Sequence, residues 1–322
     1  MAKCVTRSVS RLHITLIDLI GRLGRIDGGA GVTLSEPSFV VSAQILDHGS
    51  IEFSGGMEYR DIAITCANRY LARACRSCGA RIEVIRGYEL HVGLGGVTQL
   101  CLSIAKSLSA SMGLDEDPIE LAKIVGRGGT SGIGTYSFKL GGFIVDAGHS
   151  YPTEKQLIGP SDQVVAPPPP MITRIEIPEN WRFVLVRPLG ARKIYGDLER
   201  RIFEEGRRMP EEEVWRVSHI LLMGLIPSVK IGDIELFKRS IGMIQEVGFK
   251  KIEWLYQDKS VWSIRKKLLL RSIEHGLSSM GPTIYIPCRE NECEEISNYI
   301  SNEKNISLDI VKGNNRGAET IC

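Results

Sequence analysis

The chain is organised around the stretch Gly93-Leu94-Gly95-Gly96, continued by Val97-Thr98-Gln99-Leu100. A short apolar segment, 88–92, precedes the glycines. Apolar residues four positions apart follow and predict one face of a helix: Leu100, Ile104, Leu108 and Met112. A glycine turn that opens a helix directs free backbone N–H groups and the positive end of the helix dipole at an anion, usually phosphate. The stretch alone fits a phosphate site and a plain turn about equally well, because glycine-rich turns are common.

Length and composition describe an ordinary globular chain. Of its 322 residues, 43% are hydrophobic and 24% charged, so we expect about two domains with buried cores. The net charge of +2 is too small to favour nucleic acid or a membrane surface as a partner. No uncharged apolar run reaches transmembrane length. Arg11, His13 and Asp18 interrupt the segment where the core of a signal peptide would lie.

The eight cysteines are too sparse for a disulfide scaffold, which predicts a reducing, cytoplasmic location. Cys75 and Cys78 form a C-x-x-C pair at the end of an expected helix. No second pair or histidine cluster accompanies them. Two packed thiols are therefore favoured over a metal or redox site.

Strands and helices alternate in both halves of the sequence, which indicates an α+β protein with two layers per domain. Four consecutive prolines, 167–170, form an extended spacer and predict a boundary between domains 1–166 and 171–322. Two glycine-rich loops, 21–29 and 126–135, are expected to be irregular. The expected elements of the first domain are strand 4–14, strand residues within 31–46, helix 61–77, strands within 81–92, helix 118–125 capped by Asp117, and strand 143–146. Those of the second are strand 182–186, helices 196–206, 211–225, 233–247 and 260–275, strand 283–287, helix 290–303 and strand 307–311.

Arginines cluster near the glycine loops, and guanidinium groups bind phosphate oxygens in pairs. They are Arg7, Arg11, Arg22, Arg25 and Arg127. A third small-residue loop, 276–282, by itself fits an ordinary connection. Asp18, flanked by Ile17 and Leu19, needs a partner because a buried acid is costly without one. The Walker loop, the protein-kinase motifs, the phosphoribosyltransferase signature and the nucleophile elbow are absent from the sequence.

Three motifs resemble those of the superfamily of galactose, homoserine, mevalonate and phosphomevalonate (GHMP) kinases. The first comprises Arg11-Leu12-His13, Leu16-Ile17-Asp18 and Asp27-Gly28-Gly29, the second is Gly93-Leu94-Gly95-Gly96, and the third is Leu277-Ser278-Ser279-Met280-Gly281-Pro282. Their order and spacing match over nearly the whole chain. The resemblance implies a GHMP-kinase-like two-domain fold, with an N-terminal domain like ribosomal protein S5 and a ferredoxin-like C-terminal domain.

Within this superfamily the chain most resembles the β-ribofuranosylaminobenzene 5′-phosphate synthase family. The residues that carry this resemblance are 11–13, 23–29, 91–95, 98–100, 126–128, 131–135, 142–146 and 315–318. It implies condensation of phosphoribosyl pyrophosphate with 4-aminobenzoate, with release of CO2 and pyrophosphate, in methanopterin biosynthesis. Such an enzyme is a decarboxylating glycosyltransferase of the phosphoribosyltransferase type, with Mg2+ on the pyrophosphate. A homodimer is a further expectation.

Under this resemblance, Asp18 and Arg25 are the first expected catalytic residues, followed by His13 and Arg11. Arg25 would neutralise pyrophosphate or hold the aminobenzoate carboxylate. Asp18 would take a proton from the amino group or stabilise the cationic adduct. The expected substrate-binding and phosphate-binding residues are Gly93, Leu94, Gly95, Gly96, Thr98, Gln99, Arg127, Ser131, Gly132, Ser278 and Ser279. No metal ligand is assigned.

One departure concerns the second motif, where Gly96-Val97-Thr98 stands at positions that the kinases fill with serines. The missing hydroxyls weaken the main alternative, an ATP-dependent small-molecule kinase. Val97 is also bulkier than the small residue expected in the synthase pattern. A non-catalytic protein that binds a phosphorylated ligand is the second alternative. The retention of both Asp18 and Arg25 argues against it.

Overall fold

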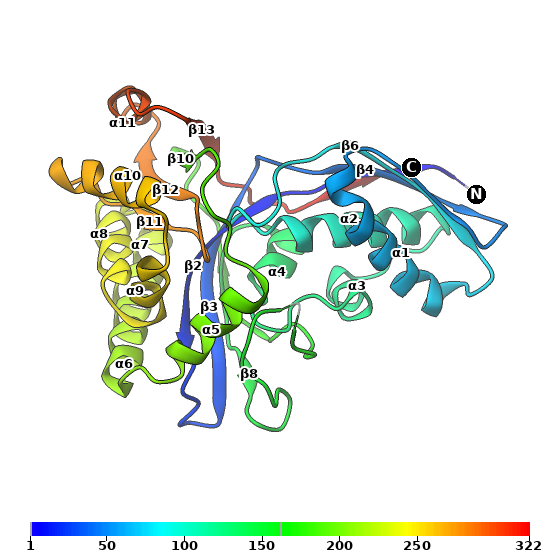
Figure 1. Cartoon of the computed structure of the whole chain (residues 1–322), viewed down its shortest axis with the longest axis horizontal. Helices are drawn as coiled ribbons and strands as arrows, with labels where there is room; N and C mark the ends of the chain where they lie inside the picture. Colours follow the sequence, from blue (N-terminus) through cyan, green and yellow to red (C-terminus); the bar gives the residue numbers. More distant parts are fainter. Residues whose placement is uncertain (1, 162) are drawn as a thin grey trace.

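The computed structural model describes residues 2–161 and 163–322, and its two halves meet along a pair of long antiparallel strands. These strands, β2 (Ser10–Asp18) and β3 (Arg25–Leu34), lie between the halves in Figure 1. The first motif lies in β2 and at the start of β3. The fold therefore places this motif where both halves can reach it.

One sheet lies at the end of the molecule that holds both termini (Figure 1). Its order is β14-β1-β4-β6-β5. Its strands are β1 (Cys4–Arg7), β4 (Val40–Leu46), β5 (Ile51–Ser54), β6 (Gly79–Arg86) and β14 (Glu319–Ile321). Packed with it are η1 (Met57–Tyr59), α1 (Arg60–Ala74), α2 (Gly96–Ser111) and α3 (Pro118–Val125). The three α-helices were predicted, and Asp117 caps α3 by accepting the N–H of Ile119 at 2.8 Å.

The second sheet has the order β2-β3-β7-β9, with β8 paired to β3. Its other strands are β7 (Phe143–Asp146), β8 (His149–Ser150) and β9 (Met171–Ile175). The prediction that 21–29 is irregular was wrong for residues 25–29, which begin β3. Neighbours on both sides hold this segment in the sheet, and the positive φ of Asp27 (65°) and Gly28 (66°) is accommodated there. Helix α4 (Ile133–Leu140), also unexpected, begins inside the second glycine loop.

The second half combines a four-stranded sheet with a layer of helices (Figure 1). The sheet, in the order β11-β12-β10-β13, consists of β10 (Trp181–Pro188), β11 (Gly276–Leu277), β12 (Ile284–Arg289) and β13 (Ile306–Lys312). The helices are α5 (Gly196–Gly206), α6 (Glu211–Ile220), the π-helical turn η2 (Leu221–Leu225), α7 (Ile226–Ile231), α8 (Ile234–Gln245), α9 (Gly248–Leu255), α10 (Lys259–Leu270) and α11 (Cys293–Ser301). Sequence patterns predicted this half apart from β11, α7 and α9.

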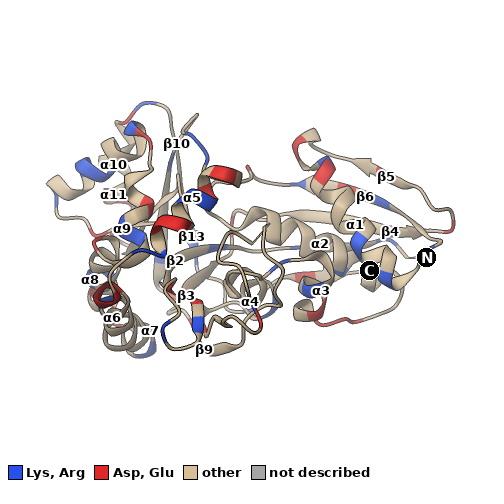
Figure 2. Ribbon diagram, turned by 60° about the horizontal axis from the view of Figure 1, so that its bottom comes forward, with Lys and Arg blue, Asp and Glu red and all other residues tan. Residues whose placement is uncertain are grey.

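Strand pairing continues across the four prolines at the expected domain boundary. Strand β9 follows them but pairs with β7, and β14 returns from the C-terminus to pair with β1. The largest hydrophobic core also includes both halves: the rings of Phe143 and Phe237 lie 6.5 Å apart. Acidic and basic residues are interspersed along the ribbon of both halves (Figure 2), as the small net charge suggests. The α+β class is confirmed.

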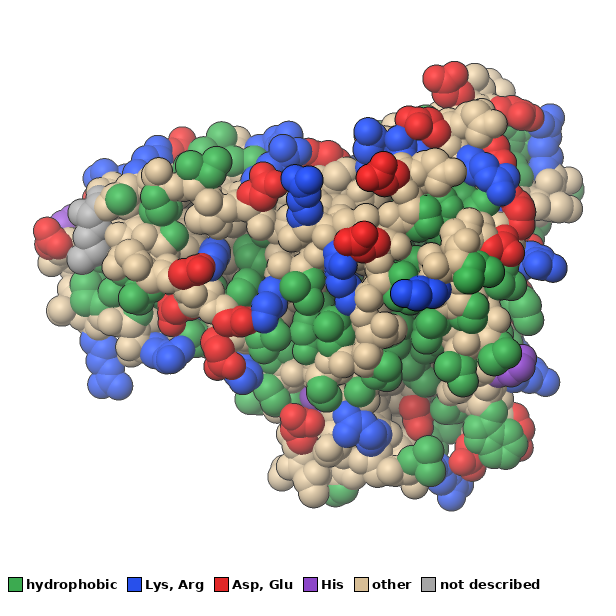
Figure 3. Space-filling model, turned by 180° about the vertical axis from the view of Figure 1, so that it is seen from behind, with side chains coloured by type: hydrophobic (Ala, Val, Ile, Leu, Met, Phe, Trp, Pro, Cys, Tyr) green, Lys and Arg blue, Asp and Glu red, His purple; other side chains and the backbone are tan. Residues whose placement is uncertain are grey.

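The helical stretch 211–231 is long and apolar enough to cross a membrane. One side of it packs into the hydrophobic core through Val217, Leu221 and Leu225, as in a core helix of a globular protein. Its other side exposes Trp215 and Leu222, and apolar side chains are visible among charged ones on the rear face (Figure 3). A homodimer that uses such an apolar face stays a prediction.

All eight cysteines are paired in disulfides, so the expectation of packed thiols at Cys75 and Cys78 was wrong. The pairs are Cys4–Cys322, Cys66–Cys101, Cys75–Cys78 and Cys288–Cys293. Pairing of β1 with β14 brings the two ends of the chain together, which no local pattern reveals. Among the described residues no cluster of His, Cys, Asp and Glu is suited to hold a metal ion.

Candidate active site

The glycine stretch forms a turn that opens α2, as predicted. Gly93 and Gly95 have φ of 87° and 78°, and the helix begins at Gly96. A side chain at Gly93 would collide with the carbonyl oxygen of Ser278. One at Gly95 would come within 3.2 Å of the Arg11 side chain. Glycine is required at both positions by the left-handed backbone and by these close neighbours.

Direct hydrogen bonds join the three sequence motifs. The hydroxyl of Ser278 donates to Gly93 O at 2.7 Å and accepts the N–H of His13 at 3.0 Å. The N–H of Ser279 donates to His13 O at 2.9 Å. Arg11 Nη1 donates to Gly93 O at 2.5 Å. Residues nearly 270 positions apart in sequence thus form one small cluster.

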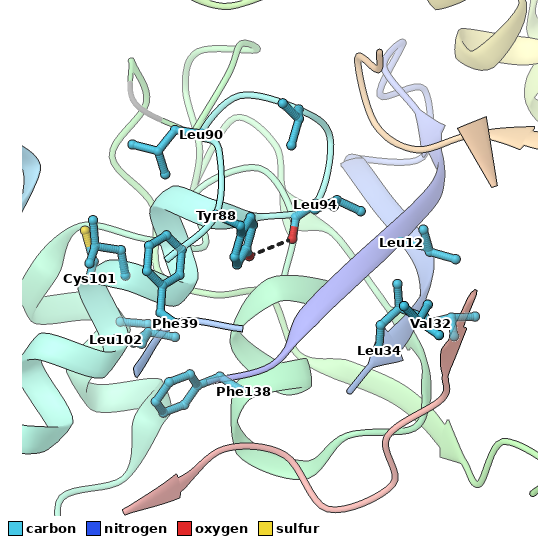
Figure 4. Packing of buried hydrophobic residues seen from close by; sticks show 14 of the residues in the cluster. Leu12, Val32, Leu34, Phe39, Tyr88, Leu90, Leu94, Cys101, Leu102 and Phe138 are labelled. Carbon is cyan, nitrogen blue, oxygen red and sulfur yellow. Dashed lines mark hydrogen bonds between the residues drawn. The ribbon is translucent and has the colours of Figure 1, made fainter. Parts of the chain in front are cut away.

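Side chains of the hydrophobic core also support the glycine turn. The phenol of Tyr88 donates to Leu94 O at 3.2 Å, and this bond is drawn in Figure 4 among the packed side chains around it. Gln99 Nε2 donates to Gly134 O at 2.8 Å and ties the first turn of α2 to α4. The turn therefore presents its backbone from a rigid support, which favours precise binding.

A cavity of about 450 Å³ opens above this turn. Its wall includes the glycine turn, Arg11 and Arg127 at one side. Apolar side chains of the first motif, of α5, of α9 and of the third loop form another part of the wall: Leu16, Phe203, Phe249 and Met280. The cavity thus combines an anion-binding helix terminus with a slot for a flat apolar group.

Two guanidinium groups face this cavity. Burial lowers the pKa of Arg11 to about 10, so Arg11 stays charged at neutral pH. Arg127 Nε donates to Thr98 Oγ1 at 3.1 Å, which fixes its guanidinium beside the start of α2. Together with the helix terminus they provide positive charge for a polyphosphate.

A chain of hydrogen bonds fixes His13 at the cavity wall. Asp146 Oδ2 accepts from the Ser131 hydroxyl at 3.1 Å, and Ser131 Oγ lies 3.2 Å from His13 Nε2. Because the hydroxyl donates to the carboxylate, it accepts from an Nε2–H, which selects that tautomer of His13. Burial, with the nearby Arg11 and Lys250, lowers the pKa of His13 well below its usual range. Burial raises the pKa of Asp146 to about 7.

Glu253 and Lys250, both on α9, form a buried ion pair that the sequence interpretation missed. Glu253 lines the cavity and is only 3% exposed, while Lys250 is fully buried and donates to Ser279 O at 3.1 Å. Burial raises the pKa of Glu253 to about 7, even though the Lys250 ammonium acts in the opposite direction. A signal was present: Glu253 is flanked by Ile252 and Trp254, the same pattern that singled out Asp18.

Most of the predicted site residues meet at this cavity. Those in its wall are Arg11, His13, Gly93, Gly95, Gly96, Thr98, Arg127, Ser131 and Ser279. Leu94, Gln99, Gly132 and Ser278 lie directly behind the wall and support it through the bonds of the glycine turn, of α4 and of the third loop.

The structure does not bring Asp18 and Arg25 into the cavity wall. Asp18 Oδ1 accepts the N–H groups of Ile20 (2.6 Å) and Gly21 (2.9 Å), which closes the turn after β2. The Arg25 guanidinium donates to Ala147 O (3.0 Å), Gly148 O (2.6 Å) and Ser150 Oγ (3.2 Å). Both side chains are engaged at the far end of the β2–β3 hairpin. Their catalytic roles stay predictions.

Solved structures with the same architecture are small-molecule kinases of the GHMP type. A homoserine kinase from Cytophaga hutchinsonii superimposes with a TM-score of 0.67, covering 100% of this chain and 98% of its own, at 14% identity. The mevalonate kinase of Methanococcus jannaschii gives 0.68, covering 97% and 98%, at 12% identity. The fold and the glycine-turn site therefore define this chain as a protein of the GHMP-kinase fold class, as the motifs predicted.

Curated relatives identify the family more narrowly. The chain is 41% identical over 288 residues to the β-ribofuranosylphenol 5′-phosphate synthase of Methanothermobacter thermautotrophicus, with 87% of each chain covered. It is 34% identical over 328 residues to the synthase of that name from Methanocaldococcus jannaschii, with 97% and 98% covered. No protein-family model matches the chain. The chain belongs to the β-ribofuranosylphenol 5′-phosphate synthase family.

Proposed function

We propose that this protein transfers the phosphoribosyl group of phosphoribosyl pyrophosphate to the ring carbon of a 4-substituted benzoate, with loss of CO2 and pyrophosphate. The sequence resemblance gave 4-aminobenzoate as the acceptor, whereas the relatives are named for a phenol product. The two acceptors differ only in an amino or hydroxyl group para to the carboxylate. One observation carries the proposal: a single cavity joins a cationic helix terminus to an aromatic slot.

The pyrophosphate is assigned to the glycine turn. Backbone N–H groups at the start of α2, with Arg11 and Arg127, match the charge and the several oxygens of this group. Pyrophosphate is also the leaving group, so donors fixed at its oxygens stabilise negative charge that grows in the transition state. No nucleophilic side chain is needed, because the acceptor ring attacks the sugar itself.

The acceptor ring is assigned to the apolar slot. Phe203 and Phe249 lie with ring centroids 5.1 Å apart, and both line the cavity. Aromatic side chains bury a flat ring well and hold it in one orientation. This slot distinguishes the proposal from binding of pyrophosphate alone.

Mg2+ would enter with the substrate. The described residues lack a cluster of His, Cys, Asp and Glu suited to a resident ion, and Mg2+ is commonly held by substrate phosphates with one or two carboxylates. Glu199 of α5 is a carboxylate of the cavity wall that fits this role. The ion would add positive charge at the departing pyrophosphate.

The test supplies the purified protein with phosphoribosyl pyrophosphate, Mg2+ and either carboxyl-labelled 4-aminobenzoate or carboxyl-labelled 4-hydroxybenzoate. The expected result is release of labelled CO2 and pyrophosphate in equal amounts with at least one acceptor. Absence of both products with both acceptors overturns the proposal. A parallel incubation with labelled ATP and small alcohols tests the kinase alternative, which predicts phosphate transfer instead.

A further inference from the structure

We infer that Glu253 is the general base of this site, taking the proton from the group para to the acceptor carboxylate and returning it to the product. This role rests on the proposed function and adds to it the orientation of the acceptor. The para group points at α9, and the ring carbon that bears the carboxylate points at the sugar.

Helix geometry places Glu253 beside the aromatic slot. Phe249 and Glu253 are four positions apart on α9 and share one helix face, and both line the cavity. Met280 and Phe203 line it as well. A ring lying in this slot has apolar side chains beside its faces and the Glu253 carboxylate near its polar edge.

Lys250 holds this carboxylate in place. Its Nζ pairs with Glu253 Oε2 and donates to Ser279 O of the third motif, so the lysine is fixed between α9 and the loop. The ion pair with Lys250 is made through Oε2, and the Glu253 carboxylate lines the cavity. The carboxylate is therefore positioned to accept a proton from a bound ligand.

Two other titratable groups near the cavity, Asp146 and His13, are hydrogen-bonded within the protein, and Glu199 of the wall is assigned to Mg2+. Asp146 lies behind Ser131, bonded to it and to the backbone of Gly132 and Gly148. The His13 Nε2–H is bound to Ser131. The pKa of Glu253, about 7, lies close to neutral pH, which suits a group that must both take and return a proton.

The step balances without an added reactant. The para O–H or N–H bond breaks and its proton moves to Glu253. The electron pair moves into the ring, and the carbon bearing the carboxylate forms a bond to the anomeric carbon as the bond to pyrophosphate breaks. The C–C bond to the carboxylate then breaks, CO2 leaves, and its electrons restore the aromatic ring. Glu253 returns the proton to the para oxygen or nitrogen.

The experiment compares wild type with Glu253→Gln, using phosphoribosyl pyrophosphate, Mg2+ and the acceptor that wild type uses. We expect kcat to fall about 100-fold in the variant, since general-base catalysis typically contributes this much or more. We also expect the acidic limb of the wild-type pH profile of kcat/KM, near pH 7, to disappear. Glu253→Asp should restore part of the rate. Lys250→Met should shift the limb to higher pH, because the ammonium favours the ionised carboxylate.

Controls distinguish an unfolded variant, an incorrect role of Glu253 and an incorrect proposed function. Glu204→Gln, on the exposed side of α5, should leave the rate and the pH profile unchanged. Thermal unfolding and binding of phosphoribosyl pyrophosphate report whether Glu253→Gln is folded. A folded Glu253→Gln variant with the wild-type rate and limb overturns the role of Glu253 while the proposed function stands. If wild type itself releases neither CO2 nor pyrophosphate, the proposed function fails and this role with it.

Discussion

Two buried charge clusters in this molecule have similar composition and different surroundings. Glu253 and Lys250 are buried but form part of the cavity wall. Asp27, His149 and Lys155 are equally buried and lie outside that wall, at the base of β8. The comparison shows that burial of an acid with a lysine does not by itself define a reactive site. The reactive site is the one whose acid also has access to a cavity.

The second cluster is held together by hydrogen bonds to one oxygen of Asp27. Asp27 Oδ2 lies 2.6 Å from His149 Nδ1 and 2.8 Å from Lys155 Nζ. His149 Nε2 donates to Pro167 O at 2.9 Å. This cluster joins β3, β8 and the polyproline segment. We therefore expect its role to be structural, in contrast to that of Glu253.

The largest expected effect is on stability, from Asp27→Ala. Removing this carboxylate leaves the buried Lys155 ammonium without its partner, which should cost about 3–5 kcal/mol of unfolding free energy. Urea denaturation measures the loss, with Asp47→Ala on the exposed surface as the control. The molecules that remain folded should keep the wild-type kcat. A lower kcat at unchanged stability would remove the distinction between the two clusters.

The pH dependence of stability tests Glu253 in the folded protein. Its folded-state pKa of about 7 lies above the ordinary value of 4.5, so the folded state binds this proton more tightly. Protonated Glu253 therefore stabilises the folded state, and this stabilisation is complete below about pH 4.5. It amounts to on the order of 3 kcal/mol and is lost as the pH rises through 7.

Urea denaturation of Glu253→Gln between pH 5 and 8 should therefore show a flatter decline than wild type. Asp146, whose pKa is also raised to about 7, remains in the variant, so part of the decline should persist. Asp146→Asn provides the matched comparison. An identical slope in wild type and Glu253→Gln would contradict a raised pKa at Glu253.

Arg127→Ala should weaken binding of phosphoribosyl pyrophosphate at one end of the cavity and leave binding of the acceptor at the other end unchanged. Loss of a charged hydrogen bond costs about 1.5–3 kcal/mol, which corresponds to a rise of about 10-fold to 150-fold in KM for phosphoribosyl pyrophosphate. Steady-state kinetics and inhibition by pyrophosphate measure this change. Lys123→Ala on α3 is the control. An equal rise in KM for the benzoate would argue against two separate ends.

The smallest expected effect comes from Ser131→Ala, which removes the link between His13 and Asp146. One neutral hydrogen bond contributes about 0.5–1.5 kcal/mol, so kcat/KM should fall by a factor of about 2–12. Ser301→Ala, exposed on α11, is the control. A loss of 100-fold or more would place the proton-transfer chemistry at His13 instead of Glu253.

Sequence patterns predicted the parts of this site that depend on local signals. The glycines before α2, the Asp117 cap and the three motifs were recognised because each needs particular residues at fixed spacing. The patterns gave no indication of α9, so Glu253 and Lys250 were not placed near the motifs. The order of motifs likewise did not show that the Asp18 and Arg25 side chains turn away from the cavity into backbone hydrogen bonds.

The sequence by itself determined the helix-opening turn at Gly93–Gly96, the α+β class and the resemblance to a family, because backbone preference and apolar periodicity act between near neighbours. Tertiary structure alone decided which charges share a cavity. Contacts such as those of Ser278 with Gly93 and of Lys250 with Ser279 join distant segments, and burial there sets the pKa of Glu253. The same long-range packing pairs Cys4 with Cys322, since only the folded sheet brings the two ends of the chain together.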